Sequence, residues 1–162
     1  MTIFDREILE IIWQLILAAF LGGLIGLERF LAHKVAGMRT YALVSLGAAL
    51  FSIISKTAFR EFWGVPSFDP SRIASQIVVG IGFLGAGIII FHKSKLRGLT
   101  TAAGLWVAAG IGMSVGYKLY GIAIFTTLLV ILILTAFWHL EEKLGKKYPA
   151  GPPDSLDENS DF

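Results

Sequence analysis

The sequence predicts an all-α fold: a polytopic membrane protein built as a bundle of about five transmembrane helices. Of the 162 residues, 55% are hydrophobic and only 16% are charged, whereas soluble domains carry about 25% charged residues. The mean hydropathy is +0.71. The charged residues are concentrated between long uncharged stretches. A chain with this composition and pattern is expected to lie in a lipid bilayer.

Five apolar stretches are each long enough to cross a hydrocarbon core of about 30 Å, because an α-helix rises about 1.5 Å per residue. We expect transmembrane helices at residues 8–30, 38–59, 72–91, 98–117 and 119–138. Together they would form one transmembrane domain over residues 1–140. Residues 141–162 turn polar and end in an acidic segment, so we expect a disordered cytoplasmic tail there.

The stretch at 72–91 is expected to be the centre of the bundle. Asp69 and Pro70 form a helix-start signal before it, and no charged residue occurs from 73 to 91. Small residues let transmembrane helices approach one another closely. We therefore interpret its glycines as a helix-packing face: Gly80, Gly82, Gly85 and Gly87.

Residues 80–85 also match the GxGxxG pattern of dinucleotide-binding turns. That pattern requires an amphipathic helix after the turn and an acidic residue about 20 positions further on. Residues 100–105 contain no acid. The match is therefore interpreted as part of a membrane helix.

Two further small-residue patterns predict close helix packing. In the first span, Gly22 and Gly26 are separated by three residues, a spacing typical of packed membrane helices. In the fourth span, small residues recur at every fourth position: Gly104, Ala108, Gly112 and Gly116. The fifth span has no such face, and we expect it at the lipid-facing edge of the bundle.

The distribution of Lys and Arg predicts the orientation, because cytoplasmic loops carry an excess of these residues. With five spans, one side would hold nine basic residues: Arg29, Lys34, Arg39, Lys93, Lys95, Arg97, Lys143, Lys146 and Lys147. The other side would hold five: Arg6, Lys56, Arg60, Arg72 and Lys118. We therefore expect the N-terminus outside and the C-terminus in the cytoplasm.

The composition also excludes several kinds of site. The chain has no cysteine, which excludes disulfides, thiolate metal sites and thiol nucleophiles. The net charge is +2, but the basic residues lie between apolar spans, so we expect no nucleic-acid partner. No Ser, His and Asp arrangement within the membrane predicts hydrolysis. We expect no enzyme and no catalytic residue.

Few polar residues are placed where they could carry function. Glu28 at the end of the first span and Arg39 at the start of the second are joined by a short loop, so we expect an ion pair between them. Charged groups at a bundle face are often functional, whereas the alternative is a structural clasp that sets helix register. Thr40 follows Arg39. Thr100 continues the small-residue line of the fourth span toward its start.

A second polar group lies at the start of the third span. Asp69, Arg72 and Gln76 occupy successive turns, so we expect a polar pocket that opens toward the periplasm. In the alternative interpretation, Asp69 only caps the helix, Arg72 extends to the membrane interface and Gln76 bridges helices.

A magnesium site would need several oxygen ligands, or carboxylates that hold a hydrated ion. Glu28 and Asp69 are the acids near these residues, and the expected topology places them about 30 Å apart. His33, His92 and His139 would share the cytoplasmic side, but each lies at a helix end, where histidine is ordinary. We expect no metal site and no cofactor; magnesium remains open, without a ligand cluster to support it.

Four short motifs resemble the signature blocks of the MgtC/SapB family. They are GLIGLER at residues 23–29, AGMRT at 36–40, GFLGAG at 82–87 and GLTTAA at 98–103. They follow one another in the family's order and spacing. Tyr41 stands where family members often have His. The soluble C-terminal domain of the longer members is not expected after the last span, so the resemblance covers the membrane domain.

The resemblance implies a bacterial inner-membrane protein involved in adaptation to low magnesium and, in pathogens, in virulence. It also implies regulation of other integral membrane proteins by binding them, with the lipid bilayer as the surrounding partner and a homo-oligomer left open. The alternative is a small magnesium or cation transporter or channel subunit, in which Arg72, Gln76 and Thr100 would line a path. The polar residues lie mostly at the ends of the spans, which favours regulation.

Overall fold

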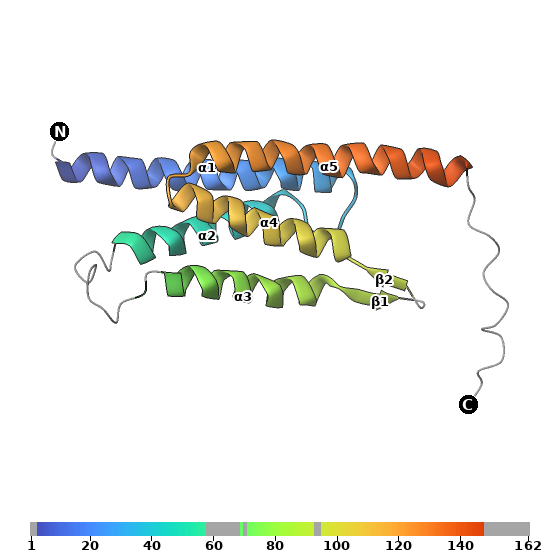
Figure 1. Cartoon of the computed structure of the whole chain (residues 1–162), viewed down its shortest axis with the longest axis horizontal. Coiled ribbons are helices and arrows are strands. Elements are labelled where there is room, and N and C mark those ends of the chain that lie inside the picture. The colour runs from blue at the N-terminus through green and yellow to red at the C-terminus, as the bar shows by residue number, and fades with distance from the viewer. Residues whose placement is uncertain (1–2, 58–68, 70, 93–94, 148–162) are drawn as a thin grey trace, which may run out of the picture.

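A computed structural model describes residues 3–57, 69, 71–92 and 95–147 of the chain. Five helices run alternately up and down (Figure 1): α1 (Ile3–Leu31), α2 (Met38–Thr57), α3 (Ser71–Ile88), α4 (Leu99–Gly116) and α5 (Tyr120–Lys147). All five are long and apolar enough to cross a membrane. The predicted fold class and number of spans are confirmed.

The core of the bundle is formed by α1, α2 and α4, and α2 packs against both of the others. Its backbone carbonyl groups are approached by glycines of both neighbours. A Cβ atom added at Gly22 of α1 would lie 2.5 Å from the carbonyl oxygen of Tyr41, and one at Gly112 of α4 would lie 2.0 Å from that of Ser45. Since real Cβ atoms do not approach an oxygen so closely, only glycine fits at these crossings.

The same contact recurs one helical turn further along α2. A Cβ atom at Gly116 of α4 would lie 2.8 Å from the carbonyl oxygen of Ala49. Tyr41, Ser45 and Ala49 are spaced by four residues, so their carbonyl groups line one side of α2. Cα–H groups at such short range form weak hydrogen bonds to carbonyl oxygens, each contributing about 0.5–1 kcal/mol. The predicted packing stripes of α1 and α4 thus meet on α2, where Gly26 also contacts the backbone of Met38.

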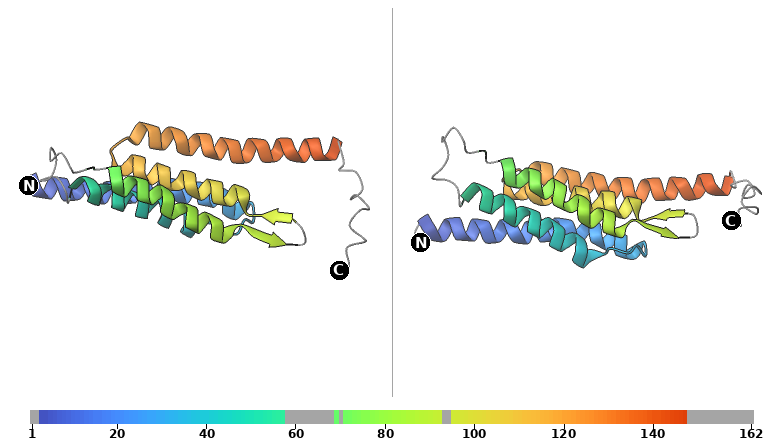
Figure 2. Two further views of the ribbon diagram at one scale, coloured as in Figure 1. Left: turned by 60° about the horizontal axis from the view of Figure 1, so that its bottom comes forward. Right: turned by 90° about the horizontal axis from the view of Figure 1, so that it is seen from below.

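The expectation that α3 is the centre of the bundle is wrong. It lies at the edge, on the opposite side of the core from α5 (Figures 1 and 2). In α3 only Ile81 and Gly85 are buried, and a Cβ atom added at Gly85 would lie an ordinary 3.5 Å from the Cβ of Ala102 in α4. The other three glycines of α3 would have nothing within 4 Å of an added Cβ atom: Gly80, Gly82 and Gly87. The high density of glycines was visible in the sequence, but not the direction in which they face.

Helix α5 lies against α1 and α4 through a narrow contact around Ala123 and Thr127, both buried. Most of its other large side chains are exposed to the surrounding lipid. Its position at the edge agrees with the absence of a small-residue face. It runs to Lys147, nine residues past the expected end at 138, because the Glu, Lys and Leu residues that follow are good helix formers.

Helix α3 ends at Ile88 and not at 91 as expected. A short antiparallel hairpin follows, formed by β1 (Ile90–His92) and β2 (Lys95–Arg97). The run of β-branched residues before it favours extended backbone. Gly98, the N-cap residue of α4, has a φ of 92°, a conformation that glycine adopts readily. The last two residues of the second expected span, 58–59, lie outside the described residues, as do most of the loop after it and most of the expected tail, 148–162.

The packing on α2 can be tested with a matched pair of α4 variants. We expect Gly112→Ala to lower the thermal unfolding midpoint in detergent strongly, because the new methyl group would collide with the Ser45 carbonyl. Gly110→Ala, two residues away and with nothing within 4 Å, should be neutral or stabilising, since Ala is favoured over Gly in helices by about 1 kcal/mol. Equal midpoints for the two variants would contradict the assignment.

Candidate functional site

The C-terminal end of α1 carries a buried ion pair between neighbouring residues. Arg29 is 3% exposed, and its Nη2 donates to Glu28 Oε1 at 2.7 Å while its Nε donates to Oε2. The expected pair between Glu28 and Arg39 is not formed, because Arg39 points outward and is exposed. A buried guanidinium requires a counter-charge, and the adjacent Glu28 supplies it in bidentate geometry.

Beside this pair, Tyr41 connects α2 to α4. Its hydroxyl donates to the backbone carbonyl of Thr101 at 3.2 Å, and the residue is fully buried. The ring end occupies the space beside Gly104, where an added Cβ atom would lie 2.5 Å from the Tyr41 hydroxyl. Tyrosine at this position therefore acts as a packing and hydrogen-bonding residue between two helices.

Two predicted threonines lie away from this cluster. Thr40 and Thr100 are both exposed, whereas Thr101 is 4% exposed. A four-residue repeat drifts around a helix of 3.6 residues per turn. The stripe through the fully buried Ala108 therefore reaches the first turn of α4 at position 101 rather than at 100.

At the other end of the bundle, a side chain of α1 forms hydrogen bonds with the C-terminal end of α4. Gln14 is 2% exposed and its Nε2 donates to the carbonyl oxygens of Val115 at 2.8 Å and Gly116 at 3.2 Å. One turn earlier, Glu10 forms an ion pair of 2.6 Å with Lys118 in the α4–α5 turn. This cluster was not predicted from the sequence. The available signal was Gln14, the lone amide within the apolar part of the first span.

Asp69 caps α3. Its Oδ1 accepts hydrogen bonds from the hydroxyl of Ser71 at 2.7 Å and from the backbone N–H of Ser71 at 2.9 Å. These two bonds favour the charged carboxylate and lower the pKa of Asp69 below its ordinary value. Arg72 and Gln76 are exposed on the turns that follow. The capping interpretation of Asp69 thus has direct geometric support.

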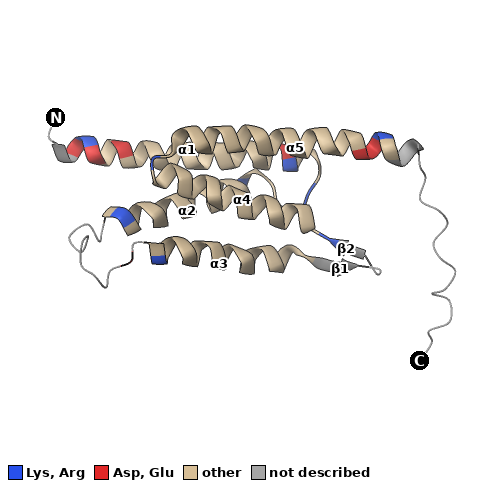
Figure 3. Cartoon of the chain, in the orientation of Figure 1, with Lys and Arg blue, Asp and Glu red and all other residues tan. Residues whose placement is uncertain are grey.

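The charged residues lie near the ends of the helices (Figure 3). Glu28 lies near the end of α1 and Asp69 at the start of α3, which are opposite ends of the bundle. Among the residues that the structure describes, no three His, Cys, Asp or Glu side chains lie close enough to hold a metal ion together. His33 is exposed, and Nδ1 of His139 lies 2.7 Å from the carbonyl oxygen of Thr135 in its own helix.

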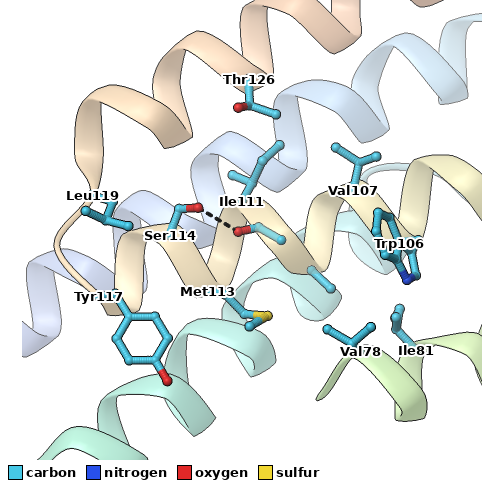
Figure 4. A pocket seen from close by; sticks show the side chains of 12 residues that line it. Val78, Ile81, Trp106, Val107, Ile111, Met113, Ser114, Tyr117, Leu119 and Thr126 are labelled. Atoms are coloured by element: carbon cyan, nitrogen blue, oxygen red, sulfur yellow. Dashed lines mark hydrogen bonds between the residues drawn. The ribbon is translucent and has the colours of Figure 1, made fainter. Parts of the chain in front are cut away.

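Open grooves flank α3, and two of them bear on function. The first, of about 410 Å³, lies between α3, α4 and the start of α5 (Figure 4). Its α4 wall is lined by residues one helical turn apart: Trp106, Gly110, Met113 and Tyr117. The second, of about 510 Å³, lies between α2 and α3. Gly47 and Gly80 form part of its walls, and Gln76 lies near one end.

The family model described as the MgtC family matches residues 15–143. The chain belongs to the MgtC family. Relatives in this family include the putative magnesium transporter YhiD of Escherichia coli K12, which is 44% identical over 140 residues. Protein MgtC of Salmonella typhimurium LT2 is 45% identical over 120 residues, and protein MgtC of Brucella abortus is 45% identical over 116 residues.

These matches cover 85%, 74% and 72% of this chain, respectively. The chain spans 65% of the length of YhiD, and 49% and 46% of the two MgtC proteins. No solved structure matches the chain. The family and its bacterial relatives, together with the five apolar helices, identify a multi-pass bacterial membrane protein.

The buried pair at the end of α1 generates a direct test. Glu28→Gln would leave the Arg29 charge buried without a counter-charge, and we expect the free energy of unfolding to fall by about 3–5 kcal/mol. Arg39→Gln, at an exposed position, should change it by less than about 0.5 kcal/mol. The measurement is equilibrium unfolding in mixed micelles. A larger loss of unfolding free energy for Arg39→Gln than for Glu28→Gln would contradict this assignment and favour the Glu28–Arg39 pair expected from the sequence.

Proposed function

We propose that this chain is a regulatory membrane protein, linked to magnesium supply, that binds transmembrane helices of other membrane proteins. The link to magnesium is supported by family membership and by the relative named as a putative magnesium transporter. Binding of other membrane proteins is supported by the groove between α3, α4 and α5, which is the observation that carries the proposal.

The α4 wall of this groove has the composition of a protein-binding surface. Trp106 is 54% exposed, and Met113 and Tyr117 continue the same face over three turns (Figure 4). Trp, Tyr and Met are enriched at protein interfaces. In a bilayer, a partly exposed groove of this kind presents aromatic anchors to an approaching helix.

Gly110 makes close approach feasible at the centre of the groove. Nothing lies within 4 Å of a Cβ atom added there, so a partner helix can contact the α4 backbone directly, as in small-residue packing elsewhere in this bundle. The nearby Ser114 hydroxyl donates to the Gly110 carbonyl at 2.9 Å. The groove therefore presents no unsatisfied hydroxyl group at this point to an apolar partner.

A second function, a small cation transporter or channel subunit, is favoured by one observation. Polar side chains are buried along the core between the two charged ends of the bundle: Gln14, Tyr41, Ser45, Ser52, Ser55 and Thr101. The hydroxyl of Ser45 is fully buried and has no hydrogen-bond partner in the described part of the chain. Hydroxyl groups alone are weak ligands for magnesium, which prefers carboxylates and retained waters.

Growth in limiting magnesium tests partner binding. In cells that depend on this chain, Trp106→Ala and Gly110→Leu should each abolish growth while membrane abundance stays normal, because one removes an anchor and the other fills the groove. The matched controls lie on α5 outside the groove: Phe125→Ala, exposed, and Gly121→Leu, with nothing within 4 Å. Normal growth of both groove variants at normal abundance would contradict the proposal.

Liposomes that contain only the purified protein separate the two functions. The regulatory proposal predicts no magnesium entry above that of empty liposomes, measured with an enclosed magnesium-sensitive dye. Protein-dependent entry that is lost in Ser45→Val would favour the transporter instead.

We further propose that the N-terminus lies outside and the C-terminus in the cytoplasm, on the strength of the Lys and Arg distribution. Lys118 and His33 are exposed at opposite ends of the bundle. Because the chain has no cysteine, single Lys118→Cys and His33→Cys variants report each side separately. An impermeant thiol reagent on intact cells should label the first and spare the second; the reverse pattern would invert the orientation.

A further inference from the structure

The groove between α2 and α3 differs from the first groove in chemistry and shape. Its volume is about 510 Å³, and aliphatic and aromatic side chains form its walls: Leu43, Val44 and Phe51 of α2, and Ile73, Ile77 and Ile81 of α3. Gly47 and Gly80, which also line it, have nothing within 4 Å of an added Cβ atom. The α2 and α3 walls of the groove are therefore mostly apolar, and at the two glycines they do not touch each other.

The length of this groove corresponds to one leaflet of the bilayer. Its α3 wall extends from Ile73 to Leu84, a distance of about 16 Å along a helix. Half of the hydrocarbon core is about 15 Å. A further hollow, of about 380 Å³, adjoins this groove and shares Val44 and Leu84 with it. An extended acyl chain needs the depth of one leaflet, which the groove provides.

Polar groups occur only at the α3 N-terminal mouth of the groove, as far as the described residues show. Gln76 lines the groove there, and Arg72 lies one turn nearer the membrane surface on the same face of α3. Arg72 is exposed. The nearby Asp69 carboxylate accepts its hydrogen bonds from Ser71, and the Arg72 charge also acts on this carboxylate. A cation in the first turn opposes the helix dipole.

We infer that this groove is a binding site for one phospholipid molecule of the leaflet at the α3 N-terminal end. Its acyl chain lies between α2 and α3 along Ile73, Ile77 and Ile81. Its phosphate pairs with the Arg72 guanidinium at the membrane surface, a charge-assisted contact of the strong kind. The Gln76 amide lies about 6 Å deeper along the helix axis, at the level of the ester groups, where it donates to a carbonyl oxygen.

Native mass spectrometry of the purified full chain tests this site with two probes that share the same acyl chains. Phosphatidylglycerol has the phosphate, and the corresponding diacylglycerol lacks it. We expect the first bound molecule of phosphatidylglycerol to have an affinity about tenfold higher than that of the diacylglycerol. One hydrogen bond between charged groups provides a difference of this size. Arg72→Gln should remove this difference. Gly80→Leu, which fills the groove, should weaken binding of both probes by about tenfold.

The chain offers a matched control for each variant. Gly82→Leu adds the same side chain on α3 where nothing lies within 4 Å and outside the groove lining, and Arg39→Gln removes an exposed arginine at the opposite end. Both should bind as the unmodified chain does. Should Gly80→Leu prove unstable, Gly47→Leu fills the groove from α2. Unchanged lipid binding in folded Gly80→Leu and Gly47→Leu would overturn the proposal. It would also be overturned if the unmodified chain formed a dimer without bound lipid and these variants dissociated that dimer.

Discussion

The close approach of three helix backbones at α2 is the contact on which the rest of the bundle depends. Within a bilayer, burial of apolar side chains does not drive helices together, because lipid tails are equally apolar. Dispersion and weak Cα–H···O contacts must do so, and both require short distances. Gly22, Gly112 and Gly116 provide those distances at successive carbonyl groups of α2. They therefore define α1, α2 and α4 as the core.

The core accounts for the position of the polar groups. Arg29, Tyr41 and Gln14 are buried at its two ends, and each is satisfied by a partner on its own or a neighbouring helix. A buried polar group without a partner would be costly, so these contacts fix the helices relative to one another. In contrast, Arg72 and Gln76 lie on α3, outside the core, and are exposed. The polar groups that fix the core are thus distinct from those on the surface of α3.

The fold class and span number followed from the sequence because bilayer thickness sets the length of an apolar helix. The packing roles of Gly22 and Gly112 also followed from their spacing. The sequence did not show which neighbour a glycine faces, so Gly80 and Gly112 appeared equivalent although only Gly112 is packed. The partner of Glu28 was missed for a related reason. An adjacent residue was not considered as its counter-charge, although a bidentate contact between neighbours on one helix is feasible.

The site was predictable only in part. Asp69 as a cap followed from its position before the helix, whereas the two grooves depend on the separation of α3 from α2 and from α5, which no local pattern encodes. Thr100 was selected on a strict four-residue repeat, and the drift of the helix placed Thr101 in the core instead. The open position of α3 is therefore the feature of the molecule that most needs measurement.

Spin labels at single introduced cysteines measure that position directly, because the chain contains no other cysteine. Oxygen accessibility in a bilayer should be high at every labelled site from 78 to 84 on α3 except at Ile81, which is buried. On α4, sites 106 to 112 should alternate between accessible and protected positions with helical periodicity. A similar alternation on α3, with half of its sites protected, would contradict an open α3 and remove the basis for both grooves.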